Sequence, residues 1–144
     1  MGGIAKTTQP LSGILEAAVY VENLDLAAAF YGDVLGIEEL GRQEGRHVFF
    51  RCGQTIVLVF RAVETKKAAP SDALPIPVHG ASGAGHLCFA VVGAELDGWR
   101  QRLEDSNVKI EADFCWPDGA RSIYFRDPGG NSIEFAEPRL WASA

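Results

Sequence analysis

The 144-residue sequence has no uninterrupted apolar run approaching the roughly 18–20 residues that cross a bilayer. It also has no Cys-x-x-Cys pair. Its three cysteines are odd in number and far apart, which disfavours a disulfide framework and a cysteine-built zinc site. The first residues lack the apolar segment of a signal peptide. We therefore expect no membrane association and a reducing, cytoplasmic setting.

Positive charge is scarce as well. The 13 Lys and Arg residues stand against 19 Asp and Glu residues, a net charge of −6 that repels phosphate backbones and anionic surfaces. Nucleic acid is therefore not an expected partner. In contrast, 47% of the residues are hydrophobic and 10% are aromatic, which is enough apolar mass to bury a core. The sequence predicts a soluble globular protein.

The first half of the chain predicts one helix among four strands. Short apolar stretches bounded by turn residues are typical of strands. The expected elements are a strand over Ile14–Val21, a helix over Leu24–Leu35, and strands over Ile37–Glu44, His47–Cys52 and Gln54–Arg61. This order is βαβββ.

The predicted helix has signals at both ends. Asn23 is a favoured N-cap residue, and Gly36 is suited to the left-handed conformation that ends a helix. Leu26, Phe30 and Val34 are four residues apart, so the spacing predicts that they share the face that packs on the core.

The second half repeats this order. The expected elements are a strand over residues 85–92, a helix from about Ala94 with Leu96, Trp99 and Leu103 on its core face, and strands over Val108–Cys115, Arg121–Arg126 and Asn131–Glu137. Aligning the halves pairs Glu16 with His86, Phe49 with Tyr124 and Val57 with Glu134. We therefore expect an α+β fold built from two tandem βαβββ modules, residues 14–61 and 84–137.

A linker over residues 62–83 separates the modules. It contains three prolines and shows neither a helical nor a strand period. Loops of this length are often disordered or functional lids. His79 near its end either faces a site or is a solvated loop residue, and the latter is favoured.

Side chains alternate between the two faces of a strand, and this places the candidate site. Glu16, His86 and Glu134 each fall on the face with small neighbours, opposite the bulky apolar residues. Two carboxylates and an imidazole suit a divalent metal such as Mn, Ni, Fe, Co or Zn. An alternative for either glutamate is an ion pair with one of four nearby arginines, Arg46, Arg51, Arg121 and Arg126.

Cys88 shares the face of His86, and we consider it either a contact of the metal or substrate or, preferably, a small core filler.

Three phrases of the sequence resemble the vicinal oxygen chelate superfamily, the glyoxalase, bleomycin resistance protein and extradiol dioxygenase group. They are EAAVYVENLDLAAAFYGDVLGI, GAGHLCFAV and YFRDPGGNSIEF. The resemblance extends over about residues 14–137 as one glyoxalase-like domain. It implies curved mixed sheets around a metal-binding cavity, and a homodimer.

The resemblance also implies roles for single residues. Glu16, His86 and Glu134 match the metal-ligand positions, while the fourth ligand position of glyoxalase I falls on Val57, which cannot bind a metal. Tyr124 matches an active-site tyrosine of fosfomycin-modifying relatives. We therefore expect a lyase or isomerase that acts on a small-molecule substrate with two adjacent oxygens. In it a metal acts as Lewis acid, Glu16 is the general base and Tyr124 donates a hydrogen bond to the substrate.

Three other activities in this group remain open. The sequence is also compatible with a fosfomycin-resistance-like enzyme, a ring-cleaving dioxygenase-like enzyme, or a non-catalytic binder like the bleomycin resistance proteins. In the binder, aromatic residues would hold a cationic ligand. The aromatic candidates are Trp99, Trp116, Tyr124 and Trp141.

Overall fold

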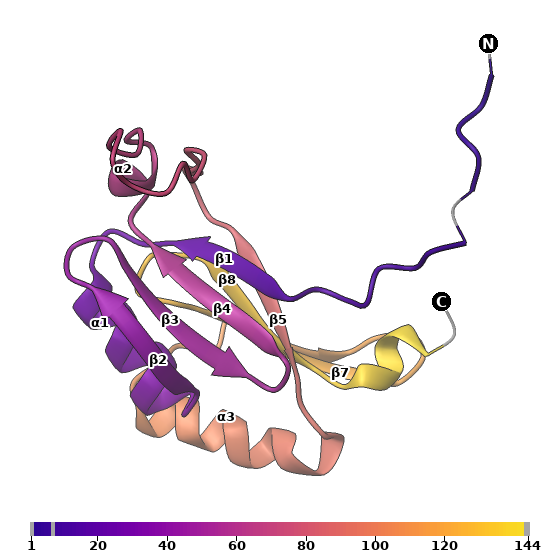
Figure 1. The fold of residues 1–144 in the computed structure, drawn as a ribbon. Helices are drawn as coiled ribbons and strands as arrows, with labels where there is room; N and C mark the ends of the chain where they lie inside the picture. The colour runs from indigo at the N-terminus through magenta and orange to yellow at the C-terminus, as the bar shows by residue number, and fades with distance from the viewer. Residues whose placement is uncertain (1, 7, 143–144) are drawn as a thin grey trace.

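The computed structural model describes residues 2–6 and 8–142 and contains two βαβββ modules in tandem (Figure 1). The first consists of β1 (Glu16–Tyr20), α1 (Leu24–Ala28), the π-helical η1 (Ala29–Val34), β2 (Glu38–Gln43), β3 (His47–Cys52) and β4 (Thr55–Phe60). The second consists of β5 (His86–Ala90), the 3-10 turn η2 (Gly93–Glu95), α3 (Leu96–Asp105), β6 (Ala112–Cys115), β7 (Arg121–Arg126) and β8 (Ser132–Ala136). The predicted α+β class and the predicted repeat are confirmed.

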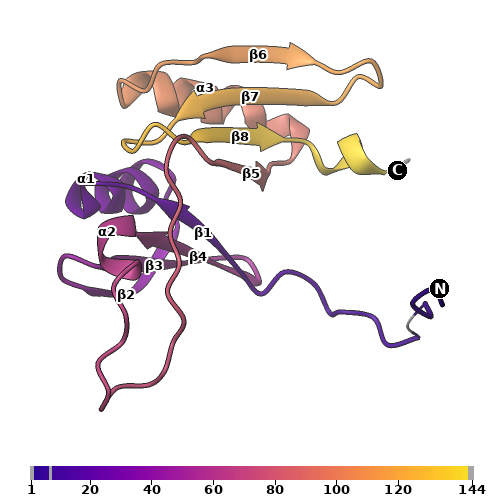
Figure 2. The same cartoon turned by 90° about the horizontal axis from the view of Figure 1, so that it is seen from above.

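Each module forms its own four-stranded sheet. The strand orders are β1-β4-β3-β2 and β5-β8-β7-β6, so the first strand of each module pairs with the last. That pairing is parallel and the others are antiparallel. The strand registers of the two modules also agree closely. The first residue of the first strand lies opposite the second residue of the last strand in the first module, Glu16 opposite Ile56, and opposite the first residue of the last strand in the second module, His86 opposite Ser132. Figure 2 shows the second sheet beside the first, with β5 and β8 nearest β1.

The first helix begins as predicted, and of the three residues expected on its core face Phe30 and Val34 pack on the core whereas Leu26 does not. Asn23 Oδ1 accepts a hydrogen bond from Leu26 N at 3.0 Å, which confirms the N-cap. However, the Leu26 side chain is 56% exposed, and the residues that enter the core are Leu24, Ala27, Phe30 and Tyr31. The helix widens into π-helical turns from Ala29, so the predicted 3.6-residue period does not continue and two adjacent aromatic residues both become buried.

One hydrophobic core extends through both modules. Leu96 and Leu103 of α3 are fully buried, and Trp99 packs on Phe135 with ring centroids 5.1 Å apart, as the helical spacing predicted. Phe30 of the first module contacts Phe125 of the second, with centroids 6.1 Å apart. The bulky sides of the two sheets therefore face helices and core, and the opposite sides remain open.

A buried polar cluster joins the modules at the end of β7. Asp127 accepts a hydrogen bond from the Tyr31 hydroxyl at 2.7 Å and two from Asn131 at 2.9 Å. Asn131 Nδ2 also donates to the carbonyl oxygen of Tyr20 at 3.0 Å. Burial, together with the Asp127 carboxylate, raises the pKa of Tyr31, so its hydroxyl stays protonated. These bonds align the ends of β1 and β8.

The linker is more structured than its sequence predicted. It begins with a short helix, α2 (Ala62–Thr65), and then forms a long loop that returns to β5 (Figure 2). His79 is not a solvated loop residue. Its backbone N–H donates to the carbonyl oxygen of Thr65 at 3.0 Å, and its ring is half-buried against Phe60, with centroids 4.8 Å apart.

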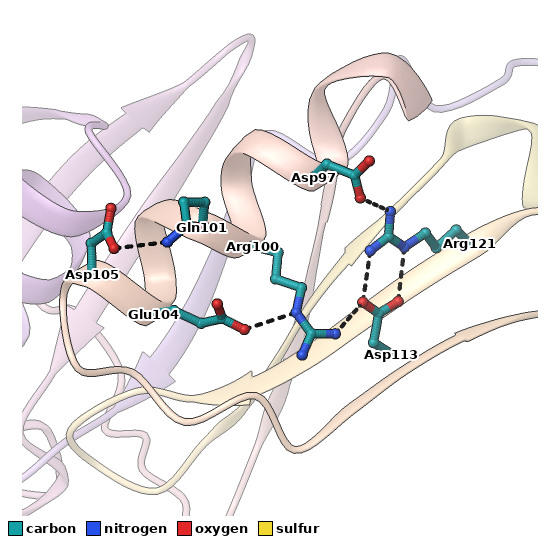
Figure 3. A network of polar contacts seen from close by, with 7 residues as sticks. All are labelled: Asp97, Arg100, Gln101, Glu104, Asp105, Asp113 and Arg121. Atoms are coloured by element: carbon teal, nitrogen blue, oxygen red, sulfur yellow. Dashed lines mark hydrogen bonds and ion pairs between the residues drawn. The ribbon is translucent and has the colours of Figure 1, made fainter.

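An ion-pair network fastens α3 to the edge of the second sheet (Figure 3). Asp113 of β6 accepts bonds at 2.7–2.8 Å from Arg121 of β7 and at 2.7 Å from Arg100 of α3. Arg121 also reaches Asp97, and Arg100 reaches Glu104. The Arg121 hydrogen bonds, followed by those of Arg100, lower the pKa of Asp113 to about 2.

We expect Asp113→Asn to lower the free energy of unfolding by about 2 kcal/mol near neutral pH, because the hydrogen bonds from Arg121 and Arg100 that lower the pKa of Asp113 to about 2 favour its charged form in the folded protein. The folded pKa is depressed, so this stabilisation is present above about pH 4 and is lost as the pH falls toward about 2. Urea unfolding of both proteins at a series of pH values tests this. Glu104→Gln, at the exposed end of the network, should change stability by less than about 0.5 kcal/mol.

The described residues contain no helix that is both long and apolar enough to cross a membrane. The three cysteines are free. The cytoplasmic setting stays a prediction.

Candidate functional site

The open face of the second sheet carries two of the three predicted metal ligands. His86 of β5 lies opposite Ser132 of β8, and Glu134 lies two residues further along β8 on the same face. The histidine side chain is half exposed, whereas the Glu134 side chain is only 7% exposed. The predicted assignment of both residues to one face therefore matches the structure.

The hydrogen bond of His86 determines which ring nitrogen faces the carboxylate. Nδ1 lies 3.0 Å from the carbonyl oxygen of Ser132, which can only accept, so Nδ1 carries the proton of the neutral ring. The lone pair of Nε2 then points to Glu134 Oε1 at 3.2 Å. A contact between two acceptor atoms at this distance is favourable only when a proton or a metal ion lies between them. The pair therefore fits a cation, with the histidine oriented as metal-binding histidines are.

A second set of hydrogen bonds orients the Glu134 carboxylate. Ser122 of β7 donates to Glu134 Oε2 at 2.6 Å, and Trp116 Nε1 donates to Ser122 Oγ at 2.8 Å. One carboxylate oxygen is thus held by the protein and the other faces His86. Sequence reasoning missed Ser122, although strand alternation from Tyr124 places it on the same face. No sequence signal showed that Trp116 reaches it.

Tyr124 and Cys88 flank Glu134 on the neighbouring strands. Burial, followed by the Glu134 carboxylate, raises the pKa of both to about 12. Both groups therefore remain protonated at neutral pH. Cys88 is exposed on the open face, so it is not the core filler that we favoured. Tyr124 stacks on His86 with ring centroids 6.2 Å apart, which places a phenol beside the His86–Glu134 pair.

Glu16 lies on the open face of the other sheet. It is exposed on β1, beside Ala18 in the wall of a cavity of about 510 Å³. Across residues 2–6 and 8–142, no three His, Cys, Asp or Glu side chains are grouped closely enough to hold a metal ion. One chain therefore brings His86 and Glu134 together but does not add Glu16 to them.

The alternative ion pairs with arginine do not form among the described residues. Arg121 binds Asp97 and Asp113, and Arg126 binds Glu111. Neither Glu16 nor Glu134 has an arginine within ion-pair distance in this part of the chain.

The predicted equivalence of Val57 with Glu134 is wrong by one residue. Val57 is 3% exposed and faces the core. Phe49 lies opposite Leu58 just as Tyr124 lies opposite Glu134, so Leu58 occupies the repeat-related position. Leucine also cannot bind a metal, so the expectation that this position supplies no ligand is unchanged.

The aromatic set proposed for a cationic ligand is divided by the fold. Trp99 packs in the core, and Trp141 lies exposed in η3 (Pro138–Trp141). Trp116 and Tyr124 do share the open face of the second sheet, connected through Phe114, whose ring is 5.0 Å from the first and 5.8 Å from the second.

Comparison with known proteins gives a consistent family. Residues 13–135 match the model of the Glyoxalase/Bleomycin resistance protein/Dioxygenase superfamily. A lactoylglutathione lyase crystal structure from Agrobacterium tumefaciens is 44% identical with a TM-score of 0.88, and the alignment covers 92% of this chain and 98% of that chain.

Two more distant structures share the fold. A glyoxalase/dioxygenase from Nostoc punctiforme is 23% identical with a TM-score of 0.66, covering 93% of this chain and 97% of that one. A glyoxalase/bleomycin resistance protein/dioxygenase from Nocardioides is 20% identical with a TM-score of 0.68, covering 92% and 85%. From its sequence, its paired βαβββ modules and these matches, the chain belongs to the glyoxalase/bleomycin resistance protein/dioxygenase superfamily.

Proposed function

We propose that this protein is a divalent-metal-dependent lyase of the glyoxalase type, with His86 and Glu134 as two metal ligands. The observation that carries this proposal is the distance of 3.2 Å between His86 Nε2 and Glu134 Oε1, with both side chains held from behind by hydrogen bonds. Such outer hydrogen bonds are what orient metal ligands in proteins. The 44% identity to a lactoylglutathione lyase supports the reaction class.

The third ligand in this proposal is Glu16 from a second copy of the chain. Both sheets leave their ligand-bearing faces open, and Glu16 is exposed on its own sheet. In a two-fold symmetric dimer, the first sheet of one copy can face the second sheet of the other, and symmetry then gives two identical sites. The ligand set would be one imidazole and two carboxylates, which suits Mn, Fe, Co, Ni or Zn.

The proposed substrate is a small molecule with oxygens on adjacent carbons. The name of the Agrobacterium protein indicates lactoylglutathione, in which a hydroxyl and a thioester carbonyl are adjacent. A bound metal would supply Lewis-acid stabilisation of negative charge on such oxygens. Tyr124 stays protonated, so its hydroxyl can donate a hydrogen bond to a substrate oxygen beside Glu134. Glu16 would move the proton between the two carbons as general base.

Metal content and turnover test this proposal together. The protein is purified without chelator, its metal content per subunit is measured by elemental analysis, and cleavage or formation of S-lactoylglutathione is followed. We expect near-stoichiometric metal, and activity that chelation removes and Mn, Ni, Fe, Co or Zn restores. A chain that takes up no metal from any of these solutions contradicts the proposal and favours a binding protein.

Ser122→Ala is expected to weaken metal binding by about 10- to 100-fold, because the change frees the carboxylate that Ser122 orients. Affinity is measured by competition with a chelating dye. Ser132→Ala is the matched control, since Ser132 holds His86 through its backbone carbonyl and not through its hydroxyl. Equal affinities for the two variants, with both proteins folded, would show that Ser122 does not position Glu134.

A further inference from the structure

We infer that a cavity on the core side of the second sheet, where the two modules meet, binds a small neutral aromatic molecule. The cavity measures about 260 Å³. Both modules contribute to its wall, the first with Leu35, Ile37 and Cys52 and the second chiefly with Phe89, Trp99 and Phe135. Because an apolar cavity of about 150 Å³ is sufficient to bind benzene, this one can hold a single ring with a small substituent.

The sheet itself separates this cavity from the open face. Phe89 lies opposite Phe135, and Cys88 lies opposite Glu134 one residue earlier on the same two strands. Successive side chains of a strand point to opposite faces, so Phe89 and Phe135 line the cavity while Cys88 and Glu134 face the other way. The inference therefore goes beyond the proposed function and does not rest on it.

Aromatic rings form much of the wall. The Trp99 ring lies 5.1 Å from that of Phe135, and the Phe89 ring meets Phe135 edge-on at 6.5 Å, both measured between ring centroids. Aromatic rings attract one another at centroid separations of about 4.5–7 Å. A ligand ring that enters the cavity can pack against these side chains in the same way.

The charges near the cavity favour a neutral ligand. Glu95 in the wall is exposed and would repel an anion, which would also lose its hydration on entry. The guanidinium of Arg102 lies 5.5 Å from the centroid of the Trp99 ring and disfavours a cation. Burial raises the pKa of the Cys52 thiol, so this side chain stays uncharged and behaves as a small hydrophobic group.

Arg102 also fixes the two modules to each other beside the cavity. From α3 it donates to the carbonyl oxygens of Val34 at 2.7 Å and Asp33 at 2.8 Å. These carbonyls belong to the last turn of η1, where carbonyl groups lack partners within the helix. Since Val34 directly precedes Leu35 in the wall, this part of the cavity is held in place before a ligand binds, and binding requires little additional ordering.

The first test compares toluene with benzoate by isothermal titration calorimetry. The two compounds have the same ring, but benzoate carries a negative charge. The protein is stripped of metal, so that the outcome does not depend on the metal proposal. We expect toluene to bind and benzoate to bind at least about tenfold more weakly, because the apolar wall offers no partner for a carboxylate.

A variant that fills the cavity tests the location. Ile37→Trp places a large ring in the wall and should lower the affinity for toluene at least about tenfold. Leu40→Trp is the matched control, because Leu40 is an exposed apolar residue of β2 outside the cavity wall, and it should bind toluene like the wild type. Equal affinities of the two folded variants would overturn the inference.

A second measurement needs no variant and decides the question if Ile37→Trp does not fold. The rates at which methyl methanethiosulfonate modifies the three cysteines are followed by peptide mass spectrometry. Toluene at about ten times its dissociation constant should slow the modification of Cys52 about tenfold, because the ligand covers the thiol. Cys88 and Cys115 are exposed outside the cavity and should react at unchanged rates.

Three results would overturn the inference in the wild-type protein. They are the absence of toluene binding, equal affinities for toluene and benzoate, and a toluene effect on Cys52 no greater than that on Cys88 and Cys115.

Discussion

Replacing Glu134 with glutamine is expected to remove the metal and to lower lyase turnover by more than about 100-fold. Loss of an outer hydrogen bond to a metal ligand already costs about 10- to 100-fold, and here a ligand itself loses its charge. The amide is nearly the same size as the carboxylate, so the change is chemical and not steric. Metal per subunit by elemental analysis and turnover of S-lactoylglutathione are the two measurements.

The same variant should not destabilise the metal-free protein. In the wild type, His86 Nε2 lies 3.2 Å from a carboxylate oxygen, a contact that needs a proton or a metal ion between the two atoms. The glutamine amide can donate to Nε2 while its carbonyl oxygen accepts from Ser122, so both contacts become favourable. The melting temperature of metal-free Glu134→Gln should equal or exceed that of the metal-free wild type. Lost activity therefore reports the site and not unfolding.

Glu111→Gln is the control for charge alone. Glu111 is an exposed carboxylate of the same module, paired with Arg126 at 2.6 Å. Its replacement should leave metal content and turnover unchanged. A Glu134→Gln protein that retains its metal and full turnover would contradict the role assigned to Glu134.

Strand alternation was the strongest guide to the fold and to half of the site. The short apolar strands and their turns predicted both modules, and the alternation of small and bulky residues placed His86 and Glu134 together on one face. Alternation predicts the face because each side chain of a strand points either to the buried side of the sheet or to its open side.

The sequence-based predictions were wrong where a shift of one residue decides whether a side chain faces the core or the open side. Aligning Val57 with Glu134 exchanged a core residue for its open-face neighbour Leu58, because a slip of one position reverses the face of a strand residue. Leu26 fits a regular helical period, but the turns that follow are π-helical and bring Phe30 against Phe125 of the second module. Sequence periodicity contains no information on that packing.

The relation of Glu16 to the other two ligands could not be predicted because it depends on more than local pattern. Alternation assigns Glu16 to the open face of its own sheet, and this is correct. Alternation contains no information on which other surface lies opposite this open face. The packing of His79 was missed for a similar reason, since its contact with Phe60 depends on how the linker returns across the first sheet.

A mixed dimer of two inactive variants is expected to recover activity. Glu16→Ala and His86→Ala should each be inactive when made alone, because every site in either homodimer lacks one ligand. In a dimer with one chain of each kind, one site takes Glu16 from the His86→Ala chain and His86 and Glu134 from the Glu16→Ala chain. That site is complete, while the other site lacks both residues. Turnover per dimer and metal per dimer should therefore reach about half of the wild-type values.

The experiment requires co-expression with two different affinity tags and purification through both, so that only mixed dimers are assayed. The decisive control is a mixed dimer of His86→Ala and Glu134→Gln, whose two lesions lie on the same sheet. Each of its sites then lacks one ligand, and it should stay inactive. If Glu16 instead joined His86 and Glu134 of its own chain, the first mixed dimer would be as inactive as the second. Recovery in the first alone thus separates a site shared between copies from one built within a single chain, because only sharing places the two lesions in the same site.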